Sequence, residues 1–371
     1  MENLKYKYPG TDHLALNGIT LSIEKGEFIG IVGQNGAGKS TLCQAIIGLV
    51  PQFYHGAYGG FVKVKERLAE KVPVQELCED VGLIFQNPFN QLSGARDTVY
   101  GEVAYGLQNL GIRREEMKVR IAKVLKQLGI WQYRDRNPFE LSGGQMQRVA
   151  IASILVMQPE VMILDEPTSQ LDPEGTEEVF RVVEQLSGTG KTIIMVEQKL
   201  EKMAKYCDRL ILMHDGKVVD FDTPEKIFAR DDLGEMGIQP PAFVRISKQM
   251  GLMNADGTYP VTLESTAALF HQQKCDGDMT QKLHSKVKQP VRKQSSEVLF
   301  RMEDISFSYQ KNVPVLEHLH LSLDQRTTAI IGQNGAGKTT LVRLLKGLLK
   351  PVSGTVYFGR EDISQKTVAM L

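Results

Sequence analysis

Glycines, a lysine and a hydroxyl side chain recur in two nearly identical segments of this 371-residue sequence. The first reads GQNGAGKSTL from Gly33 to Leu42, and the second reads GQNGAGKTTL from Gly332 to Leu341. Glycines let the backbone curl so that successive N–H groups point inward, and a helix that starts at the lysine adds a partial positive charge. The pattern G-x4-G-K-[ST] therefore predicts a loop that binds the phosphates of a nucleotide.

The residues around the first loop predict the strand and the helix that must position it. Residues 28–32 (FIGIV) are a short apolar run typical of a buried strand, and residues 39–47 have the apolar spacing of a helix. In this context we expect Lys39 to reach the terminal phosphates and the Ser40 hydroxyl to bind Mg2+. The predicted nucleotide-binding residues of this loop are Gly33, Gln34, Asn35, Gly36, Ala37, Gly38, Lys39, Ser40 and Thr41.

Two adjacent carboxylates end a second apolar strand. Residues 161–164 (VMIL) run directly into Asp165 and Glu166, and an open α/β sheet places its chemistry at the carboxyl ends of its strands. We expect Asp165 to orient Mg2+ through its water shell, and Glu166 to accept a proton from the water that attacks the γ-phosphate. A solvated acidic turn would explain a lone Asp-Glu pair, but the phosphate loop requires a metal-binding acid after a second strand.

A serine and two glycines stand before a further helical pattern. Residues 141–145 (LSGGQ) precede the helix-like stretch 146–157, and Ser142 has the residue type of an ordinary helix N-cap. The adjacent glycines also expose backbone N–H groups at a helix start, which makes a second anion site without a lysine. With two kinds of phosphate cradle in one chain, we expect the two to close on each other across a dimer.

Composition excludes several other classes of protein. Lys plus Arg (44) equals Asp plus Glu (44), and 42% of the residues are hydrophobic, which disfavours a disordered chain and a strongly basic nucleic-acid binder. The apolar stretches fall short of the ~18 to 20 residues of a membrane-spanning helix, and we expect no secretory signal. The four cysteines lie far apart, which indicates reduced structural thiols in the cytosol.

The repeat divides the chain into three predicted parts. These are a complete domain at residues 1–230, a linker at 231–297 and the N-terminal fragment of a second copy at 298–371. The linker is inferred from a composition rich in Gln, Lys, Ser, Gly and Pro and from the loss of strand and helix alternation. The second copy is expected to be cut short, because only residues 341–371 follow its loop threonines.

Together these motifs resemble the ATP-binding cassette (ABC) family over residues 1 to about 230. The Walker A loop, Q-loop, signature, Walker B strand and D-loop of that family are similar, in this order, to residues 33–40, Gln86, residues 141–145, residues 161–166 and residues 169–172. The resemblance implies an α/β fold of the ABC type, a P-loop NTPase with a parallel sheet core, an antiparallel β subdomain and a helical subdomain. It also implies ATP hydrolysis, with ATP and Mg2+ as the bound species.

The resemblance implies roles for individual residues as well. Tyr8 falls where such domains stack an aromatic side chain on adenine. Glu166, Gln86 and Gln198 are implied as the catalytic set, and Gln86 would also relay occupancy of the γ-phosphate site to a partner. Mg2+ ligands would be Ser40, Gln86 and Asp165. In a head-to-tail dimer of cassettes, the ATP contacts made in trans would come from Ser142, Gly143, Gly144 and Gln145.

Two features depart from the family pattern. Gln198 stands where the family usually has a switch histidine after strand 192–196, and its amide cannot carry a proton or a positive charge at neutral pH. We therefore expect slower hydrolysis with retained binding. The second copy lacks a Q-loop, signature, Walker B strand and D-loop, so we expect it neither to hydrolyse ATP nor to be secure as a separate domain. Its nucleotide-binding residues would be Gly332, Gly335, Gly337, Lys338, Thr339 and Thr340.

Three longer segments, residues 48–60, 85–112 and 165–175, resemble the ATPases of energy-coupling-factor vitamin importers, especially the fused two-cassette type. This implies a location at the cytoplasmic face of the membrane and partners that include a transmembrane coupling protein, a substrate-binding membrane protein and a second cassette, but no nucleic acid. Residues 87–140 would receive the coupling helices. The alternatives are a soluble twin-cassette ATPase acting on ribosomes or DNA, and a truncated copy that binds ATP without turnover.

Overall fold

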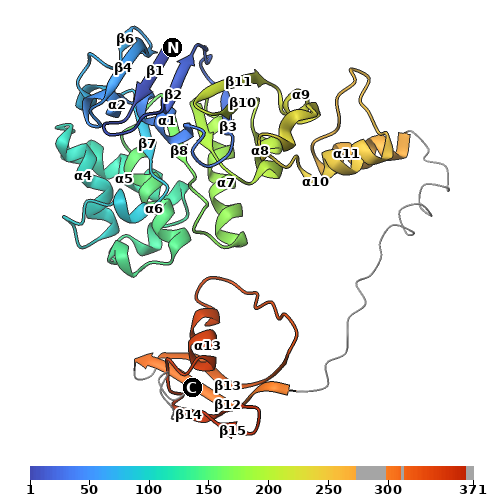
Figure 1. Cartoon of the computed structure of the whole chain (residues 1–371). Coiled ribbons are helices and arrows are strands. Elements are labelled where there is room, and N and C mark those ends of the chain that lie inside the picture. Colours follow the sequence, from blue (N-terminus) through green and yellow to red (C-terminus); the bar gives the residue numbers. More distant parts are fainter. Residues whose placement is uncertain (273–297, 311–312, 365–371) are drawn as a thin grey trace. The chain divides into compact units, whose positions relative to one another are not determined.

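The computed structural model describes residues 1–272, 298–310 and 313–364. The chain divides into two compact units between Lys282 and Leu283, the first coloured blue through yellow and the second orange to red in Figure 1. Each unit has hydrophobic core clusters of its own. Residues 273–297 of the predicted linker lie outside the described residues.

A six-stranded sheet forms the centre of the first unit, in the order β11-β10-β3-β9-β8-β7. Its strands are β3 (Phe28–Val32), β7 (Val81–Ile84), β8 (Val161–Asp165), β9 (Thr192–Val196), β10 (Arg209–His214) and β11 (Lys217–Asp222). Strands β10, β3, β9, β8 and β7 run parallel, and β11 pairs antiparallel with β10. Every residue of β3, β7 and β9 is buried, which explains why they are continuous apolar runs in the sequence.

A smaller antiparallel sheet, in the order β2-β1-β4, lies on one face of the central sheet. Its strands are β1 (Glu2–Lys7), β2 (Leu16–Ile19) and β4 (Ala57–Phe61), and a short hairpin adds β5 (Lys63–Val64) and β6 (Arg67–Leu68). Leu4 and Tyr6 of β1 are fully buried and belong to one core cluster with Ile29 and Ile31 of β3. Phe28 and Val32 belong to the other cluster, because alternate side chains of a strand face opposite sides.

Helices cover both faces of the central sheet (Figure 1). In the first 230 residues they are α1 (Lys39–Ile46), α2 (Leu49–Gln52), α3 (Val74–Leu77), α4 (Val99–Asn109), α5 (Arg114–Gln127), α6 (Gly143–Leu155), α7 (Pro173–Ser187), α8 (Leu200–Tyr206) and α9 (Pro224–Ala229). Helices α4, α5 and α6 gather into a helical layer whose buried side chains include Leu107, Leu125 and Val149. Among the described residues, no helix is both long and apolar enough to cross a membrane.

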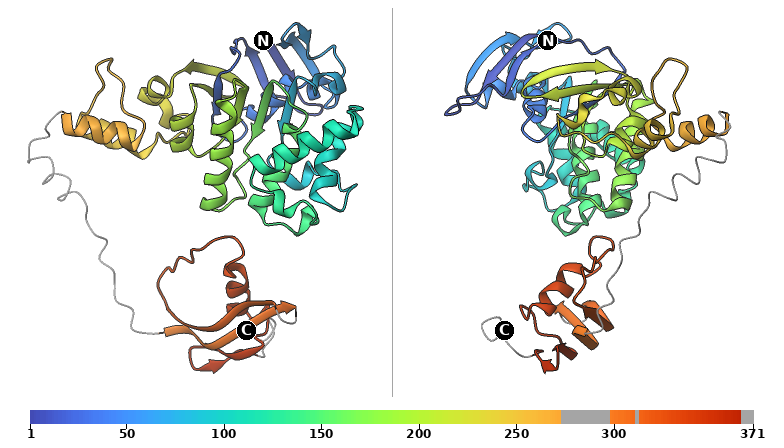
Figure 2. Two further views of the ribbon diagram at one scale, coloured as in Figure 1. Left: turned by 180° about the vertical axis from the view of Figure 1, so that it is seen from behind. Right: turned by 45° about the vertical axis from the view of Figure 1, so that its right-hand side comes forward.

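Residues 231–272 differ from the linker predicted for this segment. They contain α10 (Ala242–Met250) and α11 (Leu263–Gln272), which extend the first unit in both views of Figure 2. Leu233, Ile238, Val244 and Leu252 are buried, and the first three belong to the main core cluster of this unit. The polar composition of the segment hid its fold, although residues 242–250 have the apolar spacing of an amphipathic helix.

The second unit is built around an antiparallel sheet in the order β13-β12-β14-β15. Its elements are β12 (Val298–Gln310), β13 (Val313–Asp324), α13 (Lys338–Leu345), β14 (Ser353–Phe358) and β15 (Glu361–Asp362). A small core contains Met302, Ile305, Leu344 and Val356. Among the residues described in this unit, no strands pair in parallel.

Candidate functional site

The first glycine loop connects β3 to α1, as the sequence predicted. Gly36 and Gly38 have φ angles of 84° and 96°, which side chains other than glycine rarely allow. A Cβ atom on Gly38 would also lie 2.4 Å from the carbonyl oxygen of Ala15. Inside the curled loop, Lys39 Nζ donates hydrogen bonds of 2.9 Å to the carbonyl oxygens of Gly33 and Gln34. The lysine is thus directed into the concave side of the loop, where phosphates would bind.

Polar residues follow three neighbouring parallel strands at the same edge of the sheet. Gln86 comes after β7, Asp165 and Glu166 end or follow β8, and Gln198 comes after β9. These side chains lie close together because the carboxyl ends of adjacent parallel strands are at the same edge of the sheet.

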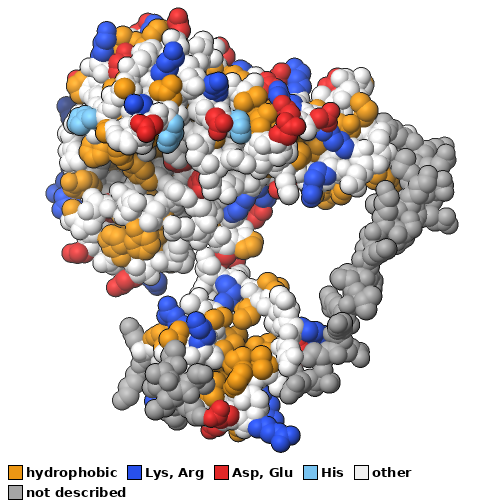
Figure 3. Space-filling view, viewed as in Figure 1, with side chains coloured by type: hydrophobic (Ala, Val, Ile, Leu, Met, Phe, Trp, Pro, Cys, Tyr) orange, Lys and Arg blue, Asp and Glu red, His pale blue; other side chains and the backbone are white. Residues whose placement is uncertain are grey.

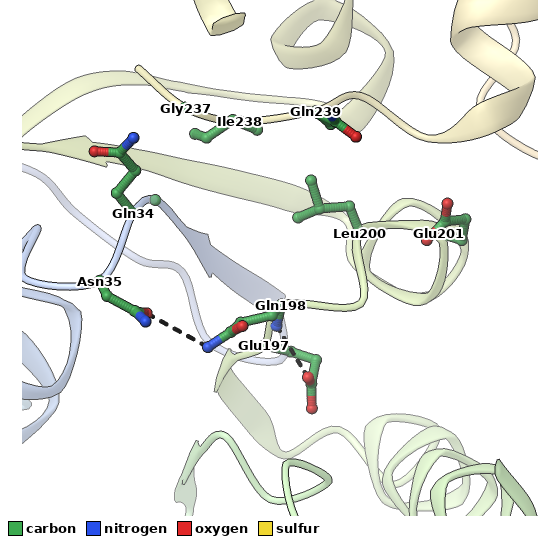
Figure 4. A pocket seen from close by; sticks show the side chains of 10 residues that line it. Gln34, Asn35, Glu197, Gln198, Leu200, Glu201, Gly237, Ile238 and Gln239 are labelled. Atoms are coloured by element: carbon green, nitrogen blue, oxygen red, sulfur yellow. Dashed lines mark hydrogen bonds between the residues drawn. The ribbon is translucent and has the colours of Figure 1, made fainter. Parts of the chain in front are cut away.

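Glu166 lies between two side-chain amides. Gln86 Nε2 donates to its Oε2 at 2.9 Å, and Gln198 Nε2 donates to its Oε1 at 3.0 Å. The amide of Gln198 also lies 3.4 Å from Asn35 Oδ1 of the glycine loop (Figure 4). The predicted catalytic residues Glu166, Gln86 and Gln198 are therefore in one hydrogen-bonded group beside the loop. Each carboxylate oxygen keeps capacity to accept a further hydrogen bond, for example from a water molecule.

A cavity of about 470 Å3 contains this group and the glycine loop. It is lined by Tyr8, His13, Ala15, Asn35, Gly36, Gly38, Lys39, Ser40, Thr41, Gln86, Glu166 and Gln198. The hydroxyl of Tyr8 lies 3.2 Å from Thr41 Oγ1 and donates to Gln44 Oε1 at 3.1 Å, which holds the ring at the edge of the cavity. His13, which also lines it, carries no motif in the sequence and was not predicted.

Burial shifts the pKa values of Lys39 in the loop and Asp165 at the end of β8 in opposite directions. It lowers the pKa of the Lys39 ammonium, and the nearby carboxylates of Glu166 and Asp165 oppose this shift. It raises the pKa of the Asp165 carboxyl, while a hydrogen bond from Ser40 acts against the rise. Both effects express the cost of holding a charge away from water.

The residues predicted to hold Mg2+ fit a hard cation. Asp165 Oδ1 is buried and makes no hydrogen bond to any described residue, an arrangement that is costly unless another group satisfies the oxygen. The Ser40 hydroxyl is within hydrogen-bonding reach of Asp165, and Gln86 lines the same cavity. Carboxylate, hydroxyl and amide oxygens are the ligand types that Mg2+ prefers.

Residues 142–145 occupy the start of α6, and they are absent from the residues that line the cavity. Ser142 is the N-cap, with Gln145 N donating to its Oγ at 3.4 Å and Gln145 Oε1 accepting from its N–H at 3.2 Å. Ser142 caps the helix, and its side chain and Gly143 are also exposed. The structure is therefore compatible both with a capping role and with an anion-binding role for this serine. Within one chain, the structure does not bring these residues to the glycine loop.

The second glycine loop has the same local geometry in the second unit. Lys338 Nζ donates to the carbonyl oxygens of Gly332 and Gln333, and the hydroxyl of Tyr309 lies 3.2 Å from Thr340 Oγ1. The predicted residues Gly332, Gly335, Gly337, Lys338, Thr339 and Thr340 form the loop and the start of α13. No Asp or Glu follows a parallel strand in the described part of this unit.

A second cavity, of about 490 Å3, lies on the other side of the first loop and was not foreseen. Figure 4 shows Gln34 and Asn35 on one side of it, Glu197 and Gln198 on another, and Gly237 to Gln239 above. A Cβ atom on Gly237 would lie 1.6 Å from Gln34 Nε2, so the extension after residue 230 is in direct contact with the loop. A glycine in a polar segment gave no sequence signal for this contact.

Comparison with protein families matches the family described as ABC transporter to residues 16–169 and 316–371. The chain is 35% identical to an ABC transporter ATP-binding protein of Methanosarcina acetivorans over 100% of its own length and 62% of that protein. A protein of the same description from Pyrococcus abyssi is 43% identical over 67% of this chain and 89% of its own length. The chain spans 62%, 64% and 65% of the length of three relatives that it matches from end to end or nearly so.

Solved structures give the same similarity. One is cbiO1 from Clostridium perfringens, described as part of the complex cbiONQ, with a TM-score of 0.55 and 33% identity over 67% of this chain and 99% of that protein. A nucleotide-free cassette from an ABC transporter gives a TM-score of 0.53 at 28% identity, over 64% of this chain and 100% of the other. A dimeric cassette bound to ADP and Pi gives 0.51 at 27%, over 60% and 98%.

Proposed function

This chain belongs to the ABC transporter family of ATP-binding cassettes, and on that premise we propose that its first unit hydrolyses ATP to drive a membrane transporter. The observation that carries the proposal is the position of Glu166. Its carboxylate lies between the amides of Gln86 and Gln198, in the same cavity as Lys39 of the phosphate loop. A base, a phosphate cradle and room for a nucleotide are present in one place.

The roles of the residues follow from this geometry. The loop amides and Lys39 bind the phosphates, and Tyr8, which lines the cavity, is the aromatic residue proposed to stack on adenine. Mg2+ bound with the nucleotide would neutralise phosphate charge, and Ser40, Asp165 and Gln86 are the residues that would hold it. Glu166 accepts a proton from the attacking water, and the amides of Gln86 and Gln198 fix the direction of its carboxylate.

We propose that the working assembly pairs the first unit with the first unit of another chain or with another cassette. Residues 142–145 lie outside the cavity of their own chain, with Ser142 and Gly143 exposed at the start of α6. A helix start of this kind is suited to contact phosphates that protrude from a neighbouring cavity. We assign the pairing to the first unit because, among the described residues, only this unit has carboxylates beside its glycine loop.

We propose that a transmembrane coupling protein binds the helical layer next to Gln86. Phe89 and Phe139 are 53% and 43% exposed and stack on each other, with ring centroids 6.1 Å apart. Figure 3 shows hydrophobic side chains on the helical part of the first unit, among charges of both signs. An exposed aromatic pair of this kind is typical of a binding surface.

The transported molecule is proposed to be a small solute, such as a vitamin, taken up by an energy-coupling-factor importer. Support comes from the segments at residues 48–60, 85–112 and 165–175 and from similarity to cbiO1, a component of cbiONQ. A soluble cassette protein acting on ribosomes or DNA is the alternative. The first test is steady-state phosphate release from MgATP by the purified chain, and absence of turnover would refute the enzymatic proposal.

The membrane partner is tested separately by sedimentation of native membranes from cells that express the chain. We expect Phe89→Asp to release the protein into the supernatant, because a charge removes the apolar contact. Phe53→Asp is the control, since Phe53 is 69% exposed and its ring contact is with Tyr54, which lies outside α4, α5 and α6. Sedimentation of wild type with ribosomes in place of membranes would favour the alternative function.

A further inference from the structure

The last residue of β9 and the three residues that follow it contact the turn that carries Glu166. The N–H of Glu166 donates to the carbonyl oxygen of Val196 at 2.9 Å, and the amide of Gln198 donates to its carboxylate. Thr168 Oγ1 donates to Glu197 Oε2 at 2.5 Å, and Lys199 Nζ donates to the carbonyl oxygen of Thr168 at 3.2 Å. Each residue from 196 to 199 therefore holds part of the turn 166–168.

Glu166 needs such support because its backbone is strained. Its φ of 47° lies in the left-handed region, which costs a residue with a side chain about 1 to 2 kcal/mol. Strained residues persist only where their surroundings determine the conformation. The turn after Glu166 is closed by hydrogen bonds from the N–H groups of Ser169 and Leu171 to the carbonyl oxygens of Glu166 and Thr168.

The hydrogen bonds of the Thr168 side chain lead to one acceptor, the carboxylate of Glu197. Lys199 donates to Thr168 Oγ1 at 2.9 Å, the threonine hydroxyl donates to the carboxylate of Glu197, and Glu197 Oε1 accepts the N–H of Gln198 at 2.9 Å (Figure 4). Thr168 is 0% and Glu197 3% exposed. A buried carboxylate is tolerated when donors and a nearby cation compensate it, and here Lys199 supplies the cation.

Lys199 also reaches beyond the turn. Its Nζ donates to Thr176 Oγ1 at 2.6 Å, and Thr176 lies in the first turns of α7. Thr168 and Thr176 stand on either side of residues 169–172. One ammonium group thus ties together both ends of the segment that follows Glu166.

We propose that Glu197 and Lys199 are positioning residues that hold Glu166 and residues 169–172 in the geometry required for ATP hydrolysis. The proposal rests on the proposed function, since it concerns the same site. Neither side chain makes a hydrogen bond to the glycine loop. Removing either side chain should therefore misplace Glu166 without lowering the affinity for nucleotide. A misplacement of about 1 Å can reduce a rate up to about 100-fold.

The test compares Lys199→Met with Lys202→Met in the full chain. Lys202, on α8, forms an ion pair with Glu177 on α7 but does not contact Thr168 or Thr176, which makes it a matched control. We expect Lys199→Met to lower kcat about tenfold at saturating MgATP while the Kd for MgADP stays within about twofold. Lys202→Met should leave both unchanged. Equal kcat for Lys199→Met and wild type would overturn the proposal, and so would a proportionate loss of nucleotide affinity.

A second measurement does not depend on activity. Hydrogen exchange of the amides in residues 166–176, without nucleotide, should be at least about fivefold faster in Lys199→Met than in wild type or Lys202→Met. If wild type shows no turnover, the proposed function fails and this comparison alone decides whether the contacts hold the segment. Unchanged exchange would overturn the proposal. Should Lys199→Met not fold, Thr176→Val keeps the shape, removes one acceptor and is expected to change exchange and kcat in the same directions.

Discussion

The two glycine loops have nearly the same backbone although their surroundings differ. Gly36 and Gly335 have φ angles of 84° and 87°, and both loop lysines bond to the first two carbonyl oxygens of their loops. Around the first loop stand two carboxylates and two amides from neighbouring parallel strands. Around the second, in the part of the chain that the structure describes, no such strands are present.

The residues before each loop show the same contrast. In the first unit, Ile31 and Val32 belong to β3 and are fully buried. The equivalent residues in the second unit, Ile330 and Ile331, are 38% and 90% exposed and form no strand. A loop of ten residues is thus determined by its own glycines, whereas the chemistry beside it is supplied by segments far away in the sequence.

The largest effect on turnover is expected from Glu166→Gln, which removes the proposed base beside the first loop and leaves the second loop unchanged. Turnover of MgATP should fall about 10³-fold, equivalent to about 4 kcal/mol, because the substituted amide cannot accept the proton of water. Glu201→Gln, near the second cavity, is the control. Residual turnover above about one tenth of wild type would contradict the role of Glu166 as the base or the assignment of hydrolysis to the first loop alone.

A stability difference follows from the different burial of the residues before the two loops. Ile31→Ala should lower the free energy of unfolding of the first unit by about 3 kcal/mol, because a fully buried side chain is lost. The same change at Ile331, which is 90% exposed, should alter stability by less than about 0.5 kcal/mol. Urea unfolding of each variant provides the measurement. Similar losses at both positions would contradict the assignment of separate environments.

The loop lysines provide a comparison of binding. Lys39→Met should weaken MgATP binding about 30-fold, or about 2 kcal/mol, as expected for loss of a charged donor to phosphate. Lys338→Met should change the affinity measured at the first site by less than about twofold. The affinity of each variant is measured by equilibrium binding of a fluorescent ATP analogue. An equal loss in both variants would show that both loops contribute to one observed affinity.

The smallest effect is expected at the switch position. Gln198→His should raise kcat about threefold with unchanged Kd, because an imidazolium adds a positive charge near the γ-phosphate. The gain over wild type should grow as the pH falls through about 6.5, where histidine becomes protonated. Phosphate release at saturating ATP, measured across this pH range, provides the readout. An unchanged rate would contradict the expectation that Gln198 slows hydrolysis.

Local motifs in the sequence were sufficient to predict the phosphate loop and the residues at the strand ends. Glu166 was identified by its position after an apolar strand, and Gln86 and Gln198 by resemblance to the ABC family; parallel pairing of the strands brings all three together. The contacts of Thr168 and Lys199 were not predicted, because a hydrogen bond between residues 31 positions apart leaves no periodic signal. The order of strands in a sheet has to be known before such partners can be found.

The segment after residue 230 was predicted wrongly for a different reason. Its buried side chains, including Leu233, Ile238, Val244 and Leu252, are separated by polar stretches of unequal length. Residues 242–250 do have the apolar spacing of an amphipathic helix, but the polar composition of the segment as a whole outweighed this short signal. Composition therefore indicated a tether where the chain packs against the core.

The contact between Gly237 and Gln34 constrains how this protein can be recombined with its relatives. A Cβ atom at residue 237 would overlap the present position of the Gln34 amide, and the φ of 64° at this residue also favours glycine. A chimera that takes the phosphate loop from one parent and the segment after residue 230 from another keeps this contact if it inherits Gly237 with Gln34, whereas another residue at 237 would displace the exposed Gln34 side chain. A truncated version ended at residue 230 would also leave the outer side of that loop without its covering segment.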